Sequence, residues 1–306
     1  MRAFIFPGQG SQSVGMGKVL AEVSQTAREL FQEVDEALGQ NLARLMAEGP
    51  PDELTLTENA QPAIMANAIA TFRASGVGIE KADFVAGHSL GEYSALCAAG
   101  SFDVATTARL LKLRGLAMQA AVPVGQGAMA ALLGASVEIA RAVAEEAAQG
   151  EVCAVANDND PSQVVISGHR GAIERALEIA KLKGAKRALL LPVSAPFHSP
   201  LMEPAARAME EALAQEQLRA PSVPLYANVT AAPVRAPDEV RRLLVEQVTG
   251  LVRWRESVAA MAEAGVTHFV EFGGKVLSPM VKRVAPDART TSVVTPDDMD
   301  ALVKEI

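Results

Sequence analysis

Short apolar runs and amphipathic helical patterns alternate along most of the chain. Residues 3–6 and 84–86 are continuous apolar runs, and Pro7 ends the first of them. Apolar runs of this length, bounded by Gly or Pro, predict short buried strands. Apolar residues at helical spacing follow over residues 21–38 and 62–75. This alternation of strands and helices predicts an α/β fold.

The middle third of the chain has a more compact pattern. It predicts a strand at 128–133, a helix at 137–148, strands at 152–156 and 164–167, a helix at 172–183 and a strand at 188–193. The resulting order, β-α-β-β-α-β, is typical of the split unit of a ferredoxin-like subdomain.

The α/β pattern resumes beyond this unit. It predicts helices at 204–215 and 237–248 and strands at 224–228 and 268–272. Because connections that leave and re-enter a sheet are common at exposed loops, we expect the compact unit to be an insertion. The predicted organisation is a large α/β domain formed by residues 1–125 and 195–306, with residues 126–194 as a small ferredoxin-like subdomain.

Composition and charge narrow the class of protein. Of the 306 residues, 49% are hydrophobic and 21% are charged, an ordinary balance for a globular protein. The formal net charge of -8 argues against broad nucleic-acid binding, which needs a basic surface. No apolar run approaches the roughly 18 residues of a membrane span, and the first residues lack the apolar run of a signal peptide. Cys97 and Cys153 lie in apolar stretches, so we expect reduced thiols and a cytoplasmic protein.

Residues 87–91, GHSLG, match the G-x-S-x-G pattern of a nucleophile elbow. In such an elbow a serine lies on a tight turn between a strand and a helix, and the flanking patterns predict both elements. Ser89 is therefore a candidate nucleophile, and the Leu90 N–H at the start of the helix can stabilise an oxyanion. The alternative is that the two glycines form a tight turn and that Ser89 merely caps the helix.

A serine nucleophile needs a base, and the chain has four histidines. His88 adjoins Ser89 on the other side of the elbow, His169 lies in a polar turn, and His268 begins an apolar strand. His198 lies in the proline-bounded loop SAPFHSP, the kind of rigid loop on which catalytic residues are often displayed. We therefore select His198 as the base, an assignment that depends on Ser89.

Arg114 is a charged residue on an apolar helix face. In the helix predicted over 104–120, it shares a stripe with Leu110, Leu111 and Met118. Because burial of a lone guanidinium is costly, its partner should be either a structural carboxylate or an anionic ligand. Taken in isolation, the pattern favours the structural carboxylate.

Together these motifs resemble those of the malonyl-CoA:acyl carrier protein transacylase family. Their common order, from residue 4 to beyond residue 280, makes the resemblance far more specific than any single motif. The matching segments are FPGQGSQ (6–12), GHSLGE (87–92), RGLAM (114–118), Asn157 with QVVISG (163–168), APFHS (195–199), QV with VRW (247–254), and EFG with VL (271–277).

The resemblance implies an α/β-hydrolase-like large domain that carries Ser89 and His198, with a ferredoxin-like subdomain inserted between them. It also implies that the backbone N–H groups of Gln9 and Leu90 form an oxyanion hole. The backbone carbonyl of Gln247 then orients the imidazole in place of a carboxylate, which makes the catalytic pair a dyad.

The resemblance further implies the substrates. Arg114 corresponds to the arginine that pairs bidentately with the free malonyl carboxylate, and Phe197 belongs to the specificity pocket that accompanies malonyl preference. The implied activity moves a malonyl group from malonyl-CoA to the phosphopantetheine thiol of an acyl carrier protein, through an ester on Ser89. The resemblance implies no metal and no cofactor, and we expect a monomer.

Alternatives from other classes remain open at this point. A serine thioesterase or esterase shares the elbow and the histidine, although Arg114 and the missing acidic third member weigh against it. A non-catalytic module that docks a carrier protein is disfavoured because nucleophile, base and anion clamp are all present. The pathway of the carrier protein also stays open. It is fatty-acid synthesis, a polyketide assembly line supplied by a trans-acting acyltransferase, or a malonate-handling complex.

Overall fold

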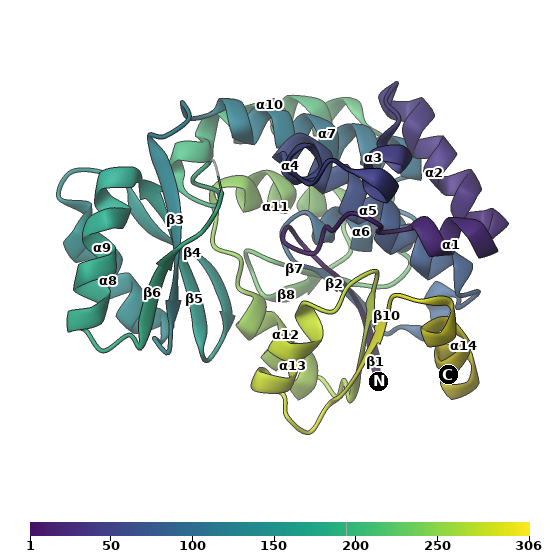
Figure 1. Cartoon of the computed structure of the whole chain (residues 1–306). Helices are drawn as coiled ribbons and strands as arrows, with labels where there is room; N and C mark the ends of the chain where they lie inside the picture. Colours follow the sequence, from purple (N-terminus) through teal and green to yellow (C-terminus); the bar gives the residue numbers. More distant parts are fainter. Residues whose placement is uncertain (194) are drawn as a thin grey trace.

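The computed structural model of the chain describes residues 1–193 and 195–306, so Ser194, in the loop predicted before His198, lies outside the described residues. In the described part the strands form two sheets, which lie side by side (Figure 1). The larger sheet has the strand order β10-β9-β1-β2-β7-β8. Its strands are β1 Arg2–Phe6, β2 Phe84–Gly87, β7 Leu225–Ala227, β8 Ala232–Val234, β9 His268–Phe272 and β10 Arg289–Val293.

The inner strands β1, β2, β7 and β9 are almost fully buried, which explains their mostly apolar sequences, whereas the edge strands β8 and β10 are largely exposed or half-buried. All neighbours pair in parallel except β7 and β8, which are antiparallel. Alternate residues of β1 enter different cores: Ala3 and Ile5 pack with Trp254, whereas Phe4 and Phe6 join the main core. A parallel sheet with helices on both faces gives this pattern.

Helices surround the larger sheet, and their order agrees with the predicted alternation. They are α1 Lys18–Val23, α2 Gln25–Leu38, α3 Leu42–Glu48, α4 Pro51–Thr55, α5 Thr57–Ala74, α6 Gly91–Ala98, α7 Val104–Ala120, α10 Glu203–Gln215, α11 Pro237–Thr249, α12 Trp254–Glu263, α13 Leu277–Val284 and α14 Pro296–Glu305, with short 3₁₀ turns at Ile79–Lys81 and Pro200–Met202. The single helix predicted over 21–38 is wrong: two helices form, because the extended Ser24 ends α1 and its side chain caps α2 at the Ala27 N–H.

Among the described helices, none has both the length and the apolar composition needed to cross a bilayer.

The small sheet is antiparallel, with the order β4-β5-β3-β6. Its elements are β3 Gly127–Leu133, α8 Val137–Ala148, β4 Cys153–Asp160, β5 Gln163–His169, α9 Arg170–Leu182 and β6 Arg187–Leu190. The predicted order β-α-β-β-α-β is confirmed. The last strand is shorter than the predicted 188–193, since Pro192 has no N–H to donate to a strand ladder.

The two faces of the small sheet have different neighbours. Ala130 and Leu132 of β3 pack in a separate core with α8 and α9, whereas Met129 and Ala131 join the main core. Strand side chains alternate between faces, so one strand serves both. The sheet therefore turns an apolar face toward the larger unit.

Ion pairs and a backbone bridge hold the small sheet against the larger unit. The Asp158 N–H donates to the Val252 carbonyl (3.0 Å), and the buried Asp158 carboxylate pairs with Arg255 of α12 (2.8 Å). Asp160, also buried, pairs with Arg283 of α13 (2.9 Å). These contacts place the apolar face of the small sheet at a fixed position.

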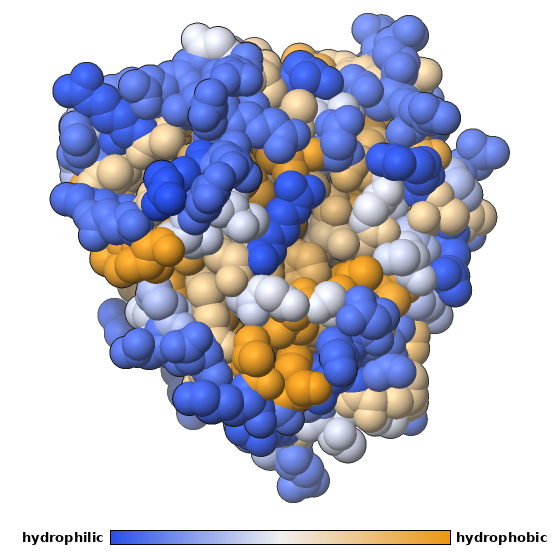
Figure 2. Space-filling view, turned by 90° about the vertical axis from the view of Figure 1, so that its right-hand side faces the viewer, coloured by the Kyte–Doolittle hydropathy of each residue, from blue (hydrophilic) through white to orange (hydrophobic). Residues whose placement is uncertain are grey.

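One face of the molecule carries both polar and apolar residues. Figure 2 views the molecule from the right-hand side of Figure 1, and hydrophilic residues cover much of this face while apolar residues gather near its middle. Apolar atoms contribute a large share of any protein surface, so this face alone identifies no site.

Candidate active site

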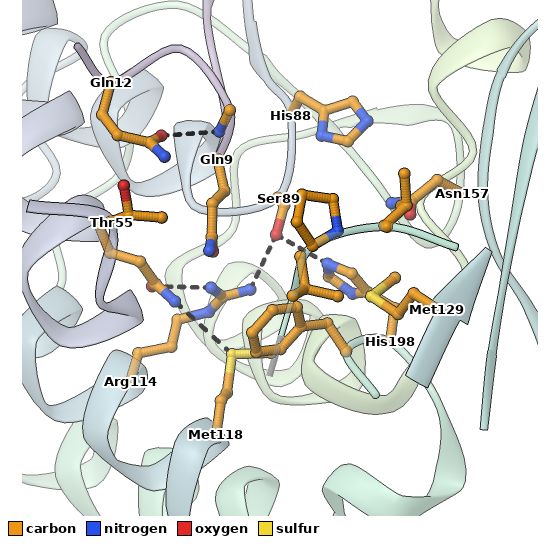
Figure 3. Close-up of a pocket in the computed structure, with 16 residues that line it drawn as sticks. Gln9, Gln12, Thr55, His88, Ser89, Arg114, Met118, Met129, Asn157 and His198 are labelled. Atoms are coloured by element: carbon orange, nitrogen blue, oxygen red, sulfur yellow. Dashed lines mark hydrogen bonds between the residues drawn. The ribbon is translucent and has the colours of Figure 1, made fainter. Parts of the chain in front are cut away.

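A cavity of about 300 Å³ lies between the larger sheet and the small sheet. It is at the carboxyl ends of β1 and β2, the usual position of a site in an α/β sheet. Figure 3 shows the residues that line it. They are Gln9, Gly10, Gln12, Thr55, Gln61, His88, Ser89, Arg114, Met118, Met129, Asn157, Leu191, Pro192, Val193, Phe197 and His198.

Ser89 lies in a sharp turn between β2 and α6. Its φ of +53° is in the left-handed region, which residues with a side chain rarely adopt. The chain passes very close to itself here: a Cβ on Gly87 would lie 1.9 Å from the Gly91 backbone, and one on Gly91 would lie 2.3 Å from the Phe6 carbonyl oxygen. Both motif glycines are therefore required by close approach. Ser89 does not cap the helix, because α6 begins after Leu90 and has no side-chain cap.

His198 lies beside Ser89 in a fixed tautomer. Ser89 Oγ is 2.7 Å from His198 Nε2, and His198 Nδ1 is 2.8 Å from the Gln247 backbone oxygen. Because a carbonyl oxygen only accepts, Nδ1 carries the proton, and Nε2 is free to accept the hydroxyl of Ser89. Gln247 is in the last turn of α11, so its carbonyl belongs to the negative end of that helix and favours positive charge on the imidazole.

The environment keeps His198 neutral. Burial, together with the positive charge of Arg114, lowers the pKa of the imidazole to about 3. The side chain is therefore in the form that accepts a proton throughout the neutral pH range.

The other three histidines have partners elsewhere. His88 also lines the cavity, but its Nε2 lies 2.7 Å from Asn159 Oδ1 and burial lowers its pKa. His169 interacts with a backbone N–H of the small unit, and His268 with side chains at the edge of the larger sheet. Within the described residues, His198 is thus the histidine that lies within hydrogen-bonding distance of Ser89.

Arg114 projects from α7 and is 1% exposed. Its Nη1 donates to Gln61 Oε1 (2.8 Å), and its Nη2 donates to Gln247 Oε1 (2.8 Å) and to Ser89 Oγ (3.1 Å). Nε has no hydrogen-bond partner in the described part of the chain. Burial lowers the pKa of Arg114, but a guanidinium remains charged in proteins.

A structural carboxylate was the partner that the pattern around Arg114 favoured in isolation, and this interpretation is wrong. Across residues 1–193 and 195–306, Arg114 forms no ion pair with Asp or Glu. Instead, the amide oxygens of Gln61 and Gln247 accept hydrogen bonds from Nη1 and Nη2 of Arg114. The centroid of the Tyr93 ring lies 5.8 Å from the guanidinium carbon. Arg114 therefore lines the cavity as a cation that has no ion-pair partner in the described residues.

The Gln247 side-chain amide connects several parts of the site. Its Nε2 donates to the Ser89 carbonyl oxygen (2.9 Å) and to Glu92 Oε2 (2.8 Å), and its Oε1 accepts from Arg114. Asn228 accepts from the Ser89 N–H (2.8 Å) and donates its own N–H to Glu92 (3.1 Å). Burial raises the pKa of Glu92 to about 7, while these hydrogen bonds and the Arg114 charge oppose the rise.

The remaining candidate residues also lie around the cavity. Gln9, in the loop after β1, and Phe197 line it, and the Gln9 side chain points into it (Figure 3). Leu90 immediately precedes α6, so its N–H is at the end of the helix where N–H groups lack intrahelical acceptors. The structure thus brings all the predicted site residues together.

Sequence reasoning gave no role to Gln61, Glu92 or Asn228. Glu92 appeared only as the last letter of the elbow motif, and Asn228 only as the end of a predicted strand. Gln61 carries no local signal, because one amide on the apolar helix α5 resembles any satisfied polar residue. Glu92 carries no distinctive signal either, because an acidic residue in the first turn of a helix is common.

In residues 1–193 and 195–306, neither a metal-binding cluster nor a disulfide is present. No set of three or more His, Cys, Asp or Glu side chains that could hold a metal ion occurs in the described residues. Cys97 and Cys153 are free, and burial raises the pKa of each thiol to about 11.

Comparison with known proteins gives consistent matches over the whole chain. Residues 3–279 match the acyl transferase domain family. The chain is 44% identical over 309 residues to the malonyl CoA-acyl carrier protein transacylase of Bacillus subtilis, covering 99% of this chain and 96% of the relative. The crystal structure of an acyl-carrier-protein-S-malonyltransferase from Bartonella henselae has a TM-score of 0.97 and 51% identity, covering 99% and 98% of the two chains. A malonyl-transacylase in complex with its type II PKS acyl-carrier protein has a TM-score of 0.96 and 38% identity, covering 100% and 99%.

Proposed function

The chain belongs to the acyl transferase family, and from this premise we propose that Ser89 is the residue that carries the acyl group. The enzyme transfers a malonyl group from malonyl-CoA to the phosphopantetheine thiol of an acyl carrier protein. One observation carries the assignment of the site: Ser89 Oγ lies 2.7 Å from His198 Nε2 and 3.1 Å from Arg114 Nη2. A nucleophile, a base and a buried cation meet at one atom, which suits an acyl group that carries a carboxylate.

In the first half-reaction, Ser89 Oγ attacks the thioester carbonyl carbon while its proton passes to His198 Nε2. The carbonyl oxygen becomes an oxyanion, to which the backbone N–H groups of Gln9 and Leu90 donate. The carbon–sulfur bond then breaks, and the coenzyme A sulfur leaves with the proton from His198. Malonyl-Ser89 and a neutral imidazole remain.

In the second half-reaction, the phosphopantetheine thiol gives its proton to His198 Nε2 and its sulfur attacks the ester carbonyl. Ser89 Oγ leaves and recovers the proton. The Gln247 carbonyl keeps the imidazole in the required tautomer in both steps, since its hydrogen bond to Nδ1 does not change. No step uses a metal or a cofactor.

Malonyl selection is the task of Arg114 and Phe197. The guanidinium is buried, charged and without an ion-pair partner among the described residues, so it can pair with the malonyl carboxylate in a water-poor pocket. Phe197 lines the same cavity next to the base and limits the size of the acyl group.

Intact-mass analysis of the full chain tests this function. After exposure to malonyl-CoA, the protein should gain one malonyl group on Ser89, and adding a phosphopantetheine-loaded acyl carrier protein should move that group to the carrier. Loss of the adduct at the same rate without a carrier protein would identify a hydrolase. Absence of any adduct would identify a non-catalytic docking module.

The finer description of the fold belongs to the same proposal. The elbow between a parallel strand and a helix supports an α/β-hydrolase-like large domain at 1–125 and 195–306. The four-stranded antiparallel sheet with two helices supports a ferredoxin-like subdomain at 126–194. Free Cys97 and Cys153 support a cytoplasmic location, where thiols are kept reduced.

A further inference from the structure

The nitrogens of the Arg114 guanidinium differ in how many of their N–H groups have hydrogen-bond acceptors. Both hydrogens of Nη2 have acceptors, Gln247 Oε1 at 2.8 Å and Ser89 Oγ at 3.1 Å. Nη1 donates to Gln61 Oε1 (2.8 Å), and Nε has no partner in residues 1–193 and 195–306. Ser89 Oγ therefore accepts from a guanidinium at the same time as it donates to His198.

A carboxylate binds an arginine bidentately through parallel N–H···O bonds. The donor pair is either Nη1 with Nη2 or Nε with Nη2, so Nη2 takes part in both arrangements. Arg255 of this chain shows the second one, since its Nε and Nη2 lie 3.0 Å and 2.8 Å from the Asp158 carboxylate oxygens. A bidentate carboxylate at Arg114 must therefore displace either Ser89 or Gln247 from Nη2.

Ser89 is the contact that yields. Its hydrogen bond to Nη2 is the longer one, at 3.1 Å against 2.8 Å for Gln247. The Gln247 amide is also held from its other end, by Glu92 Oε2 (2.8 Å) and the Ser89 carbonyl oxygen (2.9 Å). Ser89 Oγ keeps its hydrogen bond to His198 when the guanidinium leaves, so that no buried group loses its last partner.

We propose that Arg114 restrains the nucleophile until a carboxylate-bearing acyl group binds, so that the malonyl carboxylate accelerates its own transfer to Ser89. The proposal rests on the proposed function and concerns the rate of acylation rather than the affinity for the thioester. In the empty site, the guanidinium occupies one of the two lone pairs of Oγ, and its positive charge makes the oxygen a weaker nucleophile. A carboxylate that takes Nη2 frees this lone pair.

The base responds in the same direction. Attack moves a proton from Oγ to His198 Nε2, so an imidazolium forms in the same buried pocket as Arg114. The guanidinium charge opposes that step, as its lowering effect on the pKa of His198 shows. Pairing with the malonyl carboxylate neutralises the charge and makes His198 a stronger base. The Oγ–C bond then forms, the C–S bond breaks, and the proton passes through Nε2 to the coenzyme A sulfur.

Single-turnover acylation of the wild-type chain tests the proposal by intact mass. The thioesters are malonyl-CoA, malonamoyl-CoA, which has a neutral amide of nearly the same size in place of the carboxylate, and acetyl-CoA. We expect limiting rate constants at saturation to be ~10- to 100-fold lower for the two neutral thioesters, the scale of one charge-assisted hydrogen bond. Equal limiting rate constants, with all discrimination in the half-saturating concentration, would overturn the proposal.

Arg114→Met, which keeps side-chain length but removes charge and donors, separates restraint from simple binding. In the folded variant, acetyl-CoA should acylate Ser89 with a limiting rate constant roughly 10-fold or more above the wild-type value. A limiting rate constant at or below the wild-type value would refute the restraint. If the variant fails to fold by circular dichroism, the wild-type comparison decides alone. Absence of any malonyl adduct on wild-type Ser89 would instead refute the proposed function.

Discussion

The floor and the wall of the cavity differ in chemistry and in how they are held. The floor consists of Ser89, Arg114, His198 and Gln247, which are joined by hydrogen bonds of 2.7–3.1 Å. The wall consists of Met129, Leu191, Val193 and Phe197, whose apolar side chains contribute shape. A change in the floor leaves buried polar groups without partners, whereas a change in the wall alters only volume. We therefore expect floor substitutions to have much larger effects on transfer than wall substitutions.

Ser89→Ala should have the largest effect, namely complete loss of the malonyl adduct. The elbow places no other hydroxyl at the position that faces His198 Nε2, so the acyl group has no acceptor. Intact mass after exposure to malonyl-CoA measures the loss. Ser94→Ala is the control, because Ser94 is a buried serine of the neighbouring helix α6 whose Oγ has no hydrogen-bond partner in the described residues. A malonyl adduct that persists in Ser89→Ala refutes the assignment of the nucleophile.

His198→Ala should lower the rate of transfer by about 10²–10⁴-fold, the usual contribution of a general base. Malonyl-CoA should still bind, because the carboxylate partner Arg114 remains in place. Steady-state transfer and equilibrium binding of the thioester measure the two effects. His169→Ala, in the small unit away from the cavity, is the control. Near-normal transfer by the His198 variant would indicate His88 as the base.

Features of the molecule differ in how well the sequence predicted them. Elements set by a local pattern were predicted well: the helix predicted at 137–148 has the bounds of α8, Val137–Ala148. The elbow was predictable for the same reason, since Gly87 and Gly91 lie within five residues of each other and the tight turn needs both. The break at Ser24 was missed because apolar periodicity continues through it.

Contacts between distant segments could not be predicted from local patterns. Asn228 accepts a hydrogen bond from the Ser89 N–H although the two residues are 139 positions apart, and Gln61 accepts one from Arg114 at a separation of 53 positions. Amide side chains have no periodicity of their own, and only tertiary packing shows which of them is buried next to a cation. The error over the partner of Arg114 has this origin: a buried guanidinium indicates acceptors but does not tell a carboxylate from an amide.

Arg114→Ala sharpens the comparison within the floor, because it should affect one class of substrate. Loss of the partner of a buried carboxylate should weaken selection for malonyl-CoA over acetyl-CoA by about 2–5 kcal/mol. The ratio of kcat/KM for the two thioesters measures this selection. Arg114→Lys should not restore it fully, since an ammonium lacks the planar fork. Arg109→Ala, on the exposed side of α7, is the control, and an unchanged ratio in folded Arg114→Ala rules out the carboxylate clamp.

Phe197→Ala tests the wall. Enlarging the pocket should relax discrimination between malonyl-CoA and the bulkier methylmalonyl-CoA by about 1–3 kcal/mol, the scale on which a pocket senses one methyl group. Acylation by malonyl-CoA should be reduced much less than in the floor variants. Competition between the two thioesters, followed by intact mass, gives the ratio. A loss of malonyl transfer as large as that of His198→Ala would show that Phe197 also supports the floor.

The smallest expected effect is that of acid on acylation. With a pKa of about 3, His198 is neutral at pH 5.5, so its fraction in the base form should hardly change between pH 5.5 and 7.5. An imidazole with the ordinary pKa of about 6.5 would instead lose roughly tenfold of its base form over that range.

The titration of Glu92 must be distinguished from that of His198. Burial raises the pKa of Glu92 to about 7, and its carboxylate accepts a hydrogen bond from the Gln247 side chain. Protonation of Glu92 below that pH removes the charge that holds the amide. Glu92→Gln is neutral at every pH, so an inflection near pH 7 that disappears in this variant belongs to Glu92. The rate of Ser89 acylation by malonyl-CoA in Glu92→Gln should then stay within about twofold from pH 7.5 to 5.5, with circular dichroism confirming the fold at each pH. A tenfold fall centred near pH 6.5 that persists in the variant would mean that His198 is protonated in this range. Water would then reach the floor of the cavity, and the Arg114 charge would lower the pKa of His198 less than the burial of both side chains indicates.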